Sequence, residues 1–500
     1  MAGPSAIPPA PARTATPLPG SFTLTMDPST VAFDGGSVLM SGTPLRLQRL
    51  SSRAQTLVDR WCAGAPVGDR AGARLLARRL ASAGALIPRP HGAAFTADDV
   101  TVVIPVRDRP AELQRLLASL KGLACVVVDD ASADAALTRE IADEHRARFV
   151  GLPVNTGPAA ARNAGLADVT TSLVAFVDSD CLPATGWLDP LLGYLDDPLV
   201  AAVAPRIIPL APERSGWISR YEAVRSSLDR GERDGLVRPG SRLPYVPGAA
   251  LLLRRAVAGE HLFDPRLRSG EDVDLVWRLV EAGWDVRYVP ASRVEHEGPQ
   301  TLRSFLGRRA FYGLSAAPLS KRHPDDMAPL NASAWSAAVW ALAAWRRPLL
   351  ATGVLTASIL LLARRLTGLV RQPVKVAGQI AGGGTARAAL PALSGVTRAW
   401  SPALVAGLLS RRTRGAAALA LLAPAVRDWA GEPGDLDPVR YACLHVADDL
   451  AYGSGVWAGC LQQRTVRPLV PRLAWRSRVW SSPSLRSHLG PRHGAMAATD

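Results

Sequence analysis

The fold is decided by one stretch in the first half of the chain, Leu173-Val174-Ala175-Phe176-Val177, which runs directly into Asp178-Ser179-Asp180. An unbroken apolar run bounded by polar residues is typical of a strand that is buried on both faces. Similar runs lie at 100–105, 124–130 and 149–152, and helical patterns separate the runs at 111–120, 135–147 and 157–166. Strands that alternate with helices in this way predict an α/β fold, in which helices cover a parallel sheet.

Asp178 and Asp180 stand at the carboxyl end of that strand, where open α/β sheets bind their ligands. Two acids after a buried strand are costly to desolvate unless a cation pairs with them. Carboxylate oxygens suit a divalent metal such as Mn²⁺ or Mg²⁺, which can also hold a diphosphate and stabilise it as a leaving group. Two aspartates separated by one residue are common by chance, so the metal-site prediction rests on their position at the carboxyl end of a buried strand. We therefore expect Asp178 and Asp180 to bind a divalent metal.

Polar residues also follow the neighbouring strands. Asp108 comes after the first strand, and Asp129-Asp130 end the second. Carboxylates there can accept hydrogen bonds from a nucleobase or a ribose, although turns and helix N-termini favour Asp as well. Gly157 opens an Ala-rich helix that contains Arg162, whose cation can neutralise a diphosphate or hold a carboxylate in place. Close packing of that helix on the sheet is the alternative, and the two roles are compatible.

Glu271 and Asp272 lie at the start of a helical pattern that runs to residue 281. A carboxylate beside an acceptor hydroxyl can remove its proton as a general base, which makes these two residues the catalytic candidates. The helix dipole alone also favours acids at this position. His296 follows a predicted strand and can supply a third metal ligand through a neutral ring nitrogen. The simpler alternative for His296 is an exposed histidine in a turn.

Charge and cysteine content narrow the class of protein. The formal net charge is +15 over 500 residues, and such a basic chain can bind nucleic acid, anionic lipid or phosphorylated substrates. The sequence contains no zinc-finger spacing and no RNA-binding strand motif, so we expect no nucleic-acid partner. The five cysteines are scattered without a paired motif, which indicates no disulfide framework and fits the cytoplasm.

The patterns along the chain divide it into three regions. Short β-like runs and two helical patterns, at 53–62 and 70–83, predict a small α+β domain over 20–90, followed by a Pro-rich linker at 88–92. The α/β core covers 98–325. Disorder is expected only at the ends, over 1–19 and in the polar last segment.

The third region, 330–480, is rich in Ala, Leu, Trp and Arg. Its apolar runs at 331–345 and 349–363 would be about 22 Å long as helices. That length is short of the roughly 30 Å hydrocarbon core of a bilayer. Arginine pairs beside the runs favour helices associated with the cytoplasmic face of a membrane over a buried helical bundle.

Taken together, the motifs resemble the family-2 glycosyltransferases, whose Rossmann-like core is the GT-A fold. The resembling blocks come in family order across 100–300, as VTVVIPVRDRP, VVVDDAS, NTGPAAARNAGL, VAFVDSDCLP, GAALLLRR, FDPRLRSGEDVDLVWRLVEAGWDVRYVP and VEH. The resemblance implies an inverting sugar transfer in which Asp272, with Glu271 beside it, is catalytic. It implies metal ligands at Asp180, Asp178 and His296. It also implies a nucleotide-sugar site made of Pro105, Val106, Asp108, Asp129, Gly157, Arg162 and Asp178.

The whole chain resembles one group within this family, the glycosyltransferases of mycofactocin systems. Region 20–90 is similar to PqqD-like peptide-recognition domains, which are relatives of the winged helix. This resemblance implies transfer of glucose from UDP-glucose, in β-1,4 linkage, onto the peptide-derived acceptor premycofactocin, which region 20–90 would recognise. The core lacks the (Q/R)xxRW sequence of processive polysaccharide synthases, since 308–312 reads RRAFY, so a short oligosaccharide is expected.

Two other interpretations stay open. The apolar third region favours the same chemistry on a lipid-linked or cell-envelope acceptor. A non-catalytic scaffold that binds peptide or membrane is the other possibility, and the intact set of acids argues against it. As a glycosyltransferase that acts on either acceptor, the protein is expected in the cytoplasm or at the cytoplasmic face of the membrane.

Overall fold

The computed structural model describes residues 3–43, 45–211, 216–432 and 434–474. Its strands are β1 (Thr23–Met26), β2 (Val31–Phe33), β3 (Val38–Ser41), β4 (Arg46–Arg49), β5 (Leu86–Arg89), β6 (Val100–Val106), β7 (Ala124–Asp129), β8 (Arg148–Gly151), β9 (Leu173–Val177), β10 (Cys181–Pro183), β11 (Val200–Pro209), β12 (Gly235–Leu236), β13 (Ala250–Arg254), β14 (Asp285–His296), β15 (Asn331–Ser333) and β16 (Arg472–Ala474).

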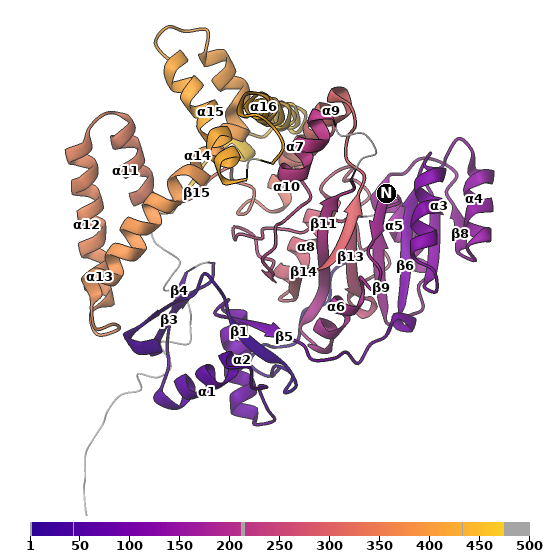
Figure 1. Ribbon diagram of the computed structural model, residues 1–500, viewed down its shortest axis with the longest axis horizontal. Coiled ribbons are helices and arrows are strands. Elements are labelled where there is room, and N and C mark those ends of the chain that lie inside the picture. Colours follow the sequence, from indigo (N-terminus) through magenta and orange to yellow (C-terminus); the bar gives the residue numbers. More distant parts are fainter. Residues whose placement is uncertain (1–2, 44, 212–215, 433, 475–500) are drawn as a thin grey trace, which may run out of the picture.

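The α-helices are α1 (Ser52–Cys62), α2 (Ala71–Ser82), α3 (Pro110–Ser119), α4 (Ala135–Glu144), α5 (Pro158–Ala167), α6 (Asp189–Leu192), α7 (Trp217–Arg225), α8 (Glu271–Glu281), α9 (Leu302–Leu314), α10 (Ala316–Arg322), α11 (Ala334–Ala344), α12 (Pro348–Leu366), α13 (Pro373–Ala377), α14 (Gly383–Gly407), α15 (Arg414–Gly431) and α16 (Pro438–Gln463). Figure 1 shows three parts: a small N-terminal part, a central sheet with its helices, and a C-terminal group of helices.

The central sheet has nine strands in the order β10-β14-β11-β13-β9-β6-β7-β8, with β12 paired to β14. Strands β9, β6, β7 and β8 run parallel, and β13 joins β9 antiparallel. One face packs on α3, α4 and α6, and the other packs on α5 and α8. The apolar runs at 100–105 and 173–177 are therefore buried on both faces, the run at 149–152 forms the partly exposed edge strand β8, and the predicted α/β class is confirmed.

Helix α5 lies unusually close to the sheet. A Cβ on Gly165 would stand 2.5 Å from Val103 Cγ1 and 2.8 Å from Val128 Cγ2. Real Cβ atoms do not approach so closely, so glycine is required at this contact. The close helix–sheet packing expected of this Ala-rich helix is present.

The N-terminal part joins two small sheets to two helices. Strands β2, β3 and β4 form an antiparallel sheet, and β1 pairs with β5. The helices predicted at 53–62 and 70–83 are present as α1 and α2. The predicted linker begins too early, because Pro88 pairs with Leu24 inside β5. Proline is tolerated there because this two-stranded sheet is all edge.

Disorder over residues 1–19 was also a wrong prediction for the described residues 3–19. Arg13 Nη2 lies 2.7 Å from Asp285 Oδ1, and Trp284 Nε1 donates to the Pro8 carbonyl oxygen at 2.7 Å. Leu18 is fully buried. This segment stays extended because it supplies a cation to a buried carboxylate and an apolar side chain to the N-terminal core.

Helix α12 is longer than the predicted apolar run at 349–363, whereas α11 is shorter than the run at 331–345, because residues 331–333 form β15. Among the described residues, α12 is the one helix long and apolar enough to cross a membrane by length and composition, and it is mostly unburied. The last turns of α12 pack on β3 of the N-terminal part, through Leu366 and Val38. Helix α16 was not predicted as an element, because acidic and small residues interrupt its apolar pattern. Residues 475–480 of the predicted region lie outside the described residues.

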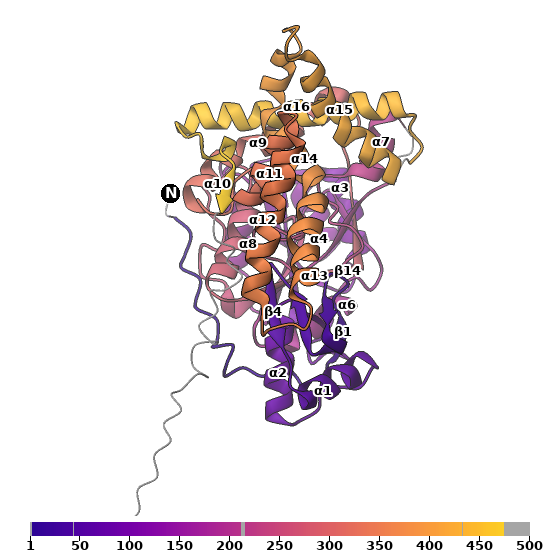
Figure 2. The same ribbon diagram turned by 90° about the vertical axis from the view of Figure 1, so that its left-hand side faces the viewer.

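Helix α16 crosses α9 at close range, as Figures 1 and 2 show. A Cβ on Gly455 would overlap the Ala310 carbonyl oxygen, and a Cβ on Gly313 would overlap the Tyr452 carbonyl oxygen. Glycine on both helices lets the backbones meet. This contact carries residues of α16 to the central cavity described next.

Candidate active site

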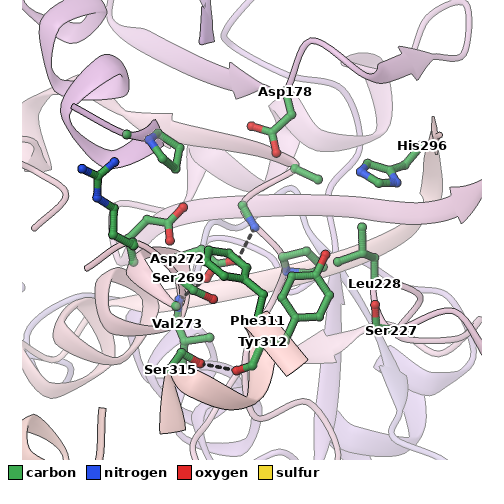
Figure 3. Close-up of a pocket in the computed structure, with 18 of the residues that line it drawn as sticks. Asp178, Ser227, Leu228, Ser269, Asp272, Val273, His296, Phe311, Tyr312 and Ser315 are labelled. Carbon is green, nitrogen blue, oxygen red and sulfur yellow. Dashed lines mark hydrogen bonds between the residues drawn. The ribbon is translucent and has the colours of Figure 1, made fainter. Parts of the chain in front are cut away.

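A single cavity of about 990 Å³ opens beyond the carboxyl ends of the parallel strands. Figure 3 shows acids, a histidine and aromatic side chains around it. Nine of the residues predicted for the site line this cavity: Pro105, Val106, Gly157, Arg162, Asp178, Asp180, Glu271, Asp272 and His296. Residues from both halves of the core sequence therefore meet in one place.

Asp180 and His296 are brought together by strand pairing. β10 runs antiparallel to β14 with Cys181 opposite His296, so the residue before Cys181 lies beside the imidazole. His296 Nε2 is 3.5 Å from Asp180 Oδ1, and Arg109 Nη1 donates to Asp180 Oδ2 at 2.7 Å. Burial lowers the pKa of His296, although the charge of Asp180 opposes that effect. A neutral imidazole beside a carboxylate can therefore coordinate a metal ion through a ring nitrogen. The His296 side chain is only 11% exposed and ends β14, so the exposed-turn alternative for it is wrong.

Arg162 holds two carboxylates from separate segments. Its Nη1 donates to Glu271 Oε1 at 2.8 Å, and its Nη2 pairs with Asp178 Oδ1. The Arg162 side chain is 3 % exposed. Burial raises the pKa of both Asp178 and Glu271, and the guanidinium counteracts this in each case. Of the two roles considered for Arg162, it fulfils that of holding carboxylates in place, because both terminal nitrogens of its guanidinium pair with carboxylates.

Asp272 lies in the first turn of α8. Among its described contacts, no cation pairs with its carboxylate. Its Oδ2 accepts a hydrogen bond from Gly248 N at 2.8 Å, and its Oδ1 accepts one from Val273 N at 2.8 Å. Both donors are backbone amides, which orient an ionised carboxylate and leave lone pairs for another partner. The side chain is partly exposed in the cavity.

Asp108 and Asp129 are not among the lining residues. Asp108 Oδ1 accepts from Ala133 N at 2.7 Å, a contact that joins the loop after β6 to the loop after β7. Asp129 Oδ2 accepts from Ser132 N at 3.1 Å, while its Oδ1 is buried without a hydrogen-bond partner. The next residue, Asp130, lines the cavity and fixes the loop before α5 by accepting from Thr156 N at 2.7 Å and Gly157 N at 2.8 Å.

The sequence was then compared with known proteins. The model of "Glycosyl transferase family 2" matches residues 101–261. The chain is 42% identical over 479 residues to the "Pre-mycofactocin glycosyltransferase" of Mycobacterium tuberculosis H37Rv, and the match covers 92% of this chain and 99% of the relative. The chain belongs to the family-2 glycosyltransferases, in the group of that relative.

Other similarities cover only the core of the glycosyltransferase or are more distant. The chain is 32% identical over 215 residues to the "Uncharacterized glycosyltransferase Rv0539" of Mycobacterium tuberculosis H37Rv, and the match covers 42% of this chain and 94% of the relative. Among solved structures, the mannosyltransferase PcManGT from Pyrobaculum calidifontis, in complex with GDP-Man and Mn²⁺, has 19% identity and a TM-score of 0.35. That match covers 68% of this chain and 91% of the other.

The three metal ligands predicted for the glycosyltransferase are not gathered by side chains alone. Within the residues that the structure describes, no three His, Cys, Asp or Glu side chains are grouped to hold a metal ion. Asp178 is paired with Arg162, and one oxygen of Asp180 is paired with Arg109. One carboxylate and one neutral imidazole remain close together, at Asp180 and His296. This donor pair fits Mn²⁺ or Mg²⁺, which take further oxygen ligands from water and from substrate phosphates.

Several lining residues of the glycosyltransferase were missed from the sequence. Arg109, which pairs with Asp180, stands inside the quoted VTVVIPVRDRP block, so its charge was visible there. Phe311 and Tyr312 lie in the RRAFY segment, which was considered only as a polymerase motif. Arg398 and Tyr452 come from α14 and α16. No local pattern pointed to these two, because only the docking of the C-terminal helices brings them to the cavity.

Proposed function

We propose that this enzyme transfers a hexose from a nucleotide-sugar to premycofactocin, with inversion at the anomeric carbon. The observation that carries the proposal is Asp272, a backbone-oriented carboxylate that shares one cavity with Asp180 and His296. The acceptor is proposed from the relative named as a pre-mycofactocin glycosyltransferase, which matches over nearly the full length. UDP-glucose as donor and a β-1,4 linkage complete the proposal.

The residues divide the work in the following way. Asp272 accepts the proton of the acceptor hydroxyl as that oxygen forms a bond to the anomeric carbon, and the bond from this carbon to the diphosphate oxygen breaks. Asp180 and His296 would hold the metal, which when bound stabilises the negative charge on the departing diphosphate. Pro105 and Val106 line the donor end of the cavity.

Arg162 and Glu271 act on the site through other residues. The guanidinium fixes Asp178 after the end of β9 and Glu271 at the start of α8, and Glu271 lies 109 residues after Arg162 in the chain. Because Glu271 is tied to Arg162 at 2.8 Å, we assign it a positioning role and leave proton removal to Asp272.

The direct test is mass spectrometry after incubation with UDP-glucose, Mn²⁺ and premycofactocin. Products heavier by one or more hexoses are expected, and their absence with folded protein would refute this acceptor. Asp272→Asn should lower turnover by about 10²–10⁴-fold and leave UDP affinity nearly unchanged. Normal turnover of that variant would exclude Asp272 as the base. Removal of metal with EDTA should abolish transfer, and Mn²⁺ should restore it. An enzyme that never cleaves UDP-sugars with any divalent metal would favour the scaffold interpretation.

Region 20–90 is proposed to recognise the peptide-derived acceptor. Its fold combines a three-stranded sheet with α1 and α2. Amide hydrogen exchange on the full chain tests this role. Premycofactocin should protect amides in region 20–90, whereas UDP-glucose alone should not. Protection confined to the central cavity would contradict it.

We also propose that the enzyme works in the cytoplasm at the inner face of the membrane. Figures 1 and 2 show the turn between α11 and α12 and the turn between α14 and α15 at the same end of the molecule. Leu349, at the start of α12, is 87% exposed beside the turn between α11 and α12, and Leu409 is 91% exposed in the turn between α14 and α15. Arg346-Arg347 and Arg411-Arg412 flank these leucines. Apolar tips ringed by arginines suit a bilayer that contains anionic lipid.

Co-sedimentation with vesicles of phosphatidylglycerol and phosphatidylcholine tests this location. The wild type should bind, and Leu349→Glu with Leu409→Glu should release it. The matched control is Leu137→Glu. Leu137 is an exposed leucine of α4, one of the helices that cover the central sheet. Equal binding by all three proteins would refute the proposal. A membrane-bound enzyme that glycosylates polyprenyl-linked lipid in place of premycofactocin would favour the alternative acceptor.

A further inference from the structure

The central cavity continues past Asp272 toward the C-terminal helices. Four residues line this far end and are called here the Arg–Tyr cluster: Arg230 from the segment between α7 and β12, Tyr245 from the segment between β12 and β13, Arg398 from α14, and Tyr452 from α16. None of them belongs to the donor or metal residues described above. The far end is therefore built from parts of the chain that the donor site does not use.

The cluster consists of two arginines that each stack on a tyrosine. The Arg230 guanidinium carbon lies 4.3 Å from the centre of the Tyr245 ring, and its Nη2 donates to the Tyr245 hydroxyl at 2.8 Å. The Arg398 guanidinium carbon lies 4.2 Å from the centre of the Tyr452 ring. A guanidinium stacked by its face keeps its N–H groups at the edge, where they can meet a planar group with oxygens.

Carboxylates only partly balance this positive charge. Asp448 Oδ1 lies 3.0 Å from Arg309 Nε but 3.7 Å from Arg398 Nη2, so its closer partner is Arg309. In the described part of the chain, Arg230 donates to the Ser227 carbonyl oxygen and to the Tyr245 hydroxyl, and to no carboxylate.

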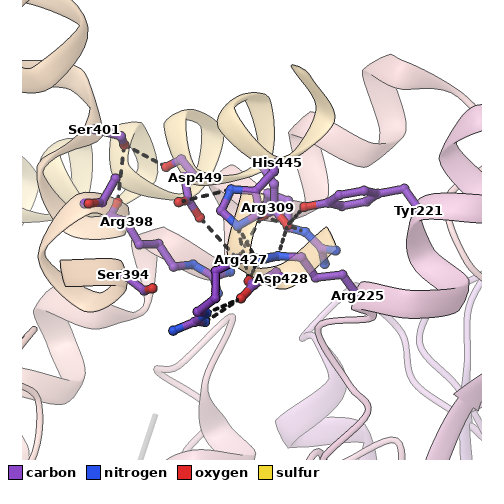
Figure 4. Close-up of polar contacts among 12 residues, drawn as sticks. Tyr221, Arg225, Arg309, Ser394, Arg398, Ser401, Arg427, Asp428, His445 and Asp449 are labelled. Carbon is purple, nitrogen blue, oxygen red and sulfur yellow. Dashed lines mark hydrogen bonds and ion pairs between the residues drawn. The ribbon is translucent and has the colours of Figure 1, made fainter. Parts of the chain in front are cut away.

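The other acids nearby pair at closer range with neighbouring arginines, as Figure 4 shows for Arg225 with Asp428 and Asp449, although, against the effect of burial, the charges of Asp448 and Asp449 also raise the pKa of Arg398. Arg225 Nη1 lies 3.0 Å from Asp428 Oδ2, and Arg309 pairs with Glu222. The Arg–Tyr cluster therefore presents excess positive charge to the cavity, and that charge favours a ligand with an anionic oxygen.

The cluster is also joined to the proposed base. Tyr245 lies three residues before Gly248, whose amide donates to Asp272 Oδ2 at 2.8 Å. Trp277 of α8 fixes the same segment, because its Nε1 donates to the Pro244 carbonyl oxygen at 2.8 Å. A ligand held by the cluster would therefore lie on the acceptor side of the base.

We propose that the Arg–Tyr cluster is the acceptor subsite, and that it selects an acceptor with an anionic oxygen, either a carboxylate or an enolate. This inference rests on the proposed glycosyl transfer and adds the acceptor chemistry to it. Arg230 and Arg398 bind the anionic oxygens through their free N–H groups, and the tyrosine rings hold both guanidiniums in place.

The test compares premycofactocin with a neutral derivative whose acidic oxygen is methylated, using wild type, Arg230→Met and Arg398→Met. The wild type should prefer the acidic form by about 10-fold to 100-fold in kcat/KM, the worth of a charged hydrogen bond. Each variant should lose most of that preference through a higher acceptor KM. Acceptor-independent hydrolysis of UDP-glucose should stay unchanged. Arg387→Met, an exposed arginine of α14, is the matched control.

Each outcome has a separate meaning. If both variants hydrolyse UDP-glucose normally and keep the acid preference, the subsite assignment is overturned. If Arg398→Met unfolds because Asp448 loses a partner, Arg230→Met decides the matter, since Arg230 contacts no carboxylate in the described chain. If the wild type itself neither hydrolyses UDP-glucose nor transfers sugar, the proposed function fails, and this result is distinguishable from failure of the subsite.

Discussion

Arg162→Met should strongly destabilise the enzyme. The Arg162 side chain is 3% exposed and is the cation that joins Asp178 to Glu271. Methionine keeps much of the side-chain volume but leaves Asp178 and Glu271 without this cation, at a site where burial already raises the pKa of each carboxyl group. Removing one partner of a buried ion pair costs about 3–5 kcal/mol. We expect the free energy of unfolding to fall by about that amount at neutral pH.

Urea unfolding followed by fluorescence measures this loss. Arg148→Met is the matched control, because Arg148 pairs with Asp168 at 2.8 Å but is 65% exposed, and it should cost less than about 1 kcal/mol. In a Glu271→Gln background the cost of Arg162→Met should shrink by about 0.5–3 kcal/mol, since one of the stranded charges is gone. A loss below about 1 kcal/mol for Arg162→Met, or strict additivity with Glu271→Gln, would refute the reasoning.

Three further predictions concern stability and domain contacts. Burial raises the pKa of Glu222 to about 7, so the folded protein holds a proton that the unfolded chain releases above its usual pKa of 4.5. Stability from this group is therefore fully present below about pH 4.5 and is lost as the pH rises through about 7, by at most about 3 kcal/mol. Glu222→Gln should flatten that slope in urea titrations between about pH 5 and pH 8, and an unchanged slope would contradict the assignment. Gly165→Ala should cost about 1–3 kcal/mol by overpacking against Val103, and Val103→Ala should recover part of the loss in thermal melts; no recovery would point to another cause. Gly455→Val should push α16 away from α9 and raise the acceptor KM while UDP-glucose hydrolysis continues, and an unchanged acceptor KM would show that α16 is not needed at the cavity.

The local sequence determined the strands, the helices and the acids at the strand ends. Apolar runs such as 173–177 report burial on both faces of a sheet, and this periodicity needs no knowledge of distant residues. The same logic placed Asp178, Asp180 and Asp272 at segment ends that face a common cavity, and it predicted α1 and α2. It failed for residues 3–19, whose order depends on a carboxylate at Asp285.

Only the tertiary structure decided which of these groups meet. The pairing of β10 with β14 places His296 beside Asp180, and the positions of α8 and of the end of β9 beside α5 give Arg162 its two carboxylate partners, Glu271 and Asp178. The docking of α16 on α9 brings Tyr452 to a cavity that starts in another part of the chain. Most of these contacts, such as those of Asp180 with His296 and of Arg162 with Glu271, join residues more than 100 positions apart, and no local pattern encodes them. Their energies come from desolvation and charge pairing, which exist only after the segments have packed together.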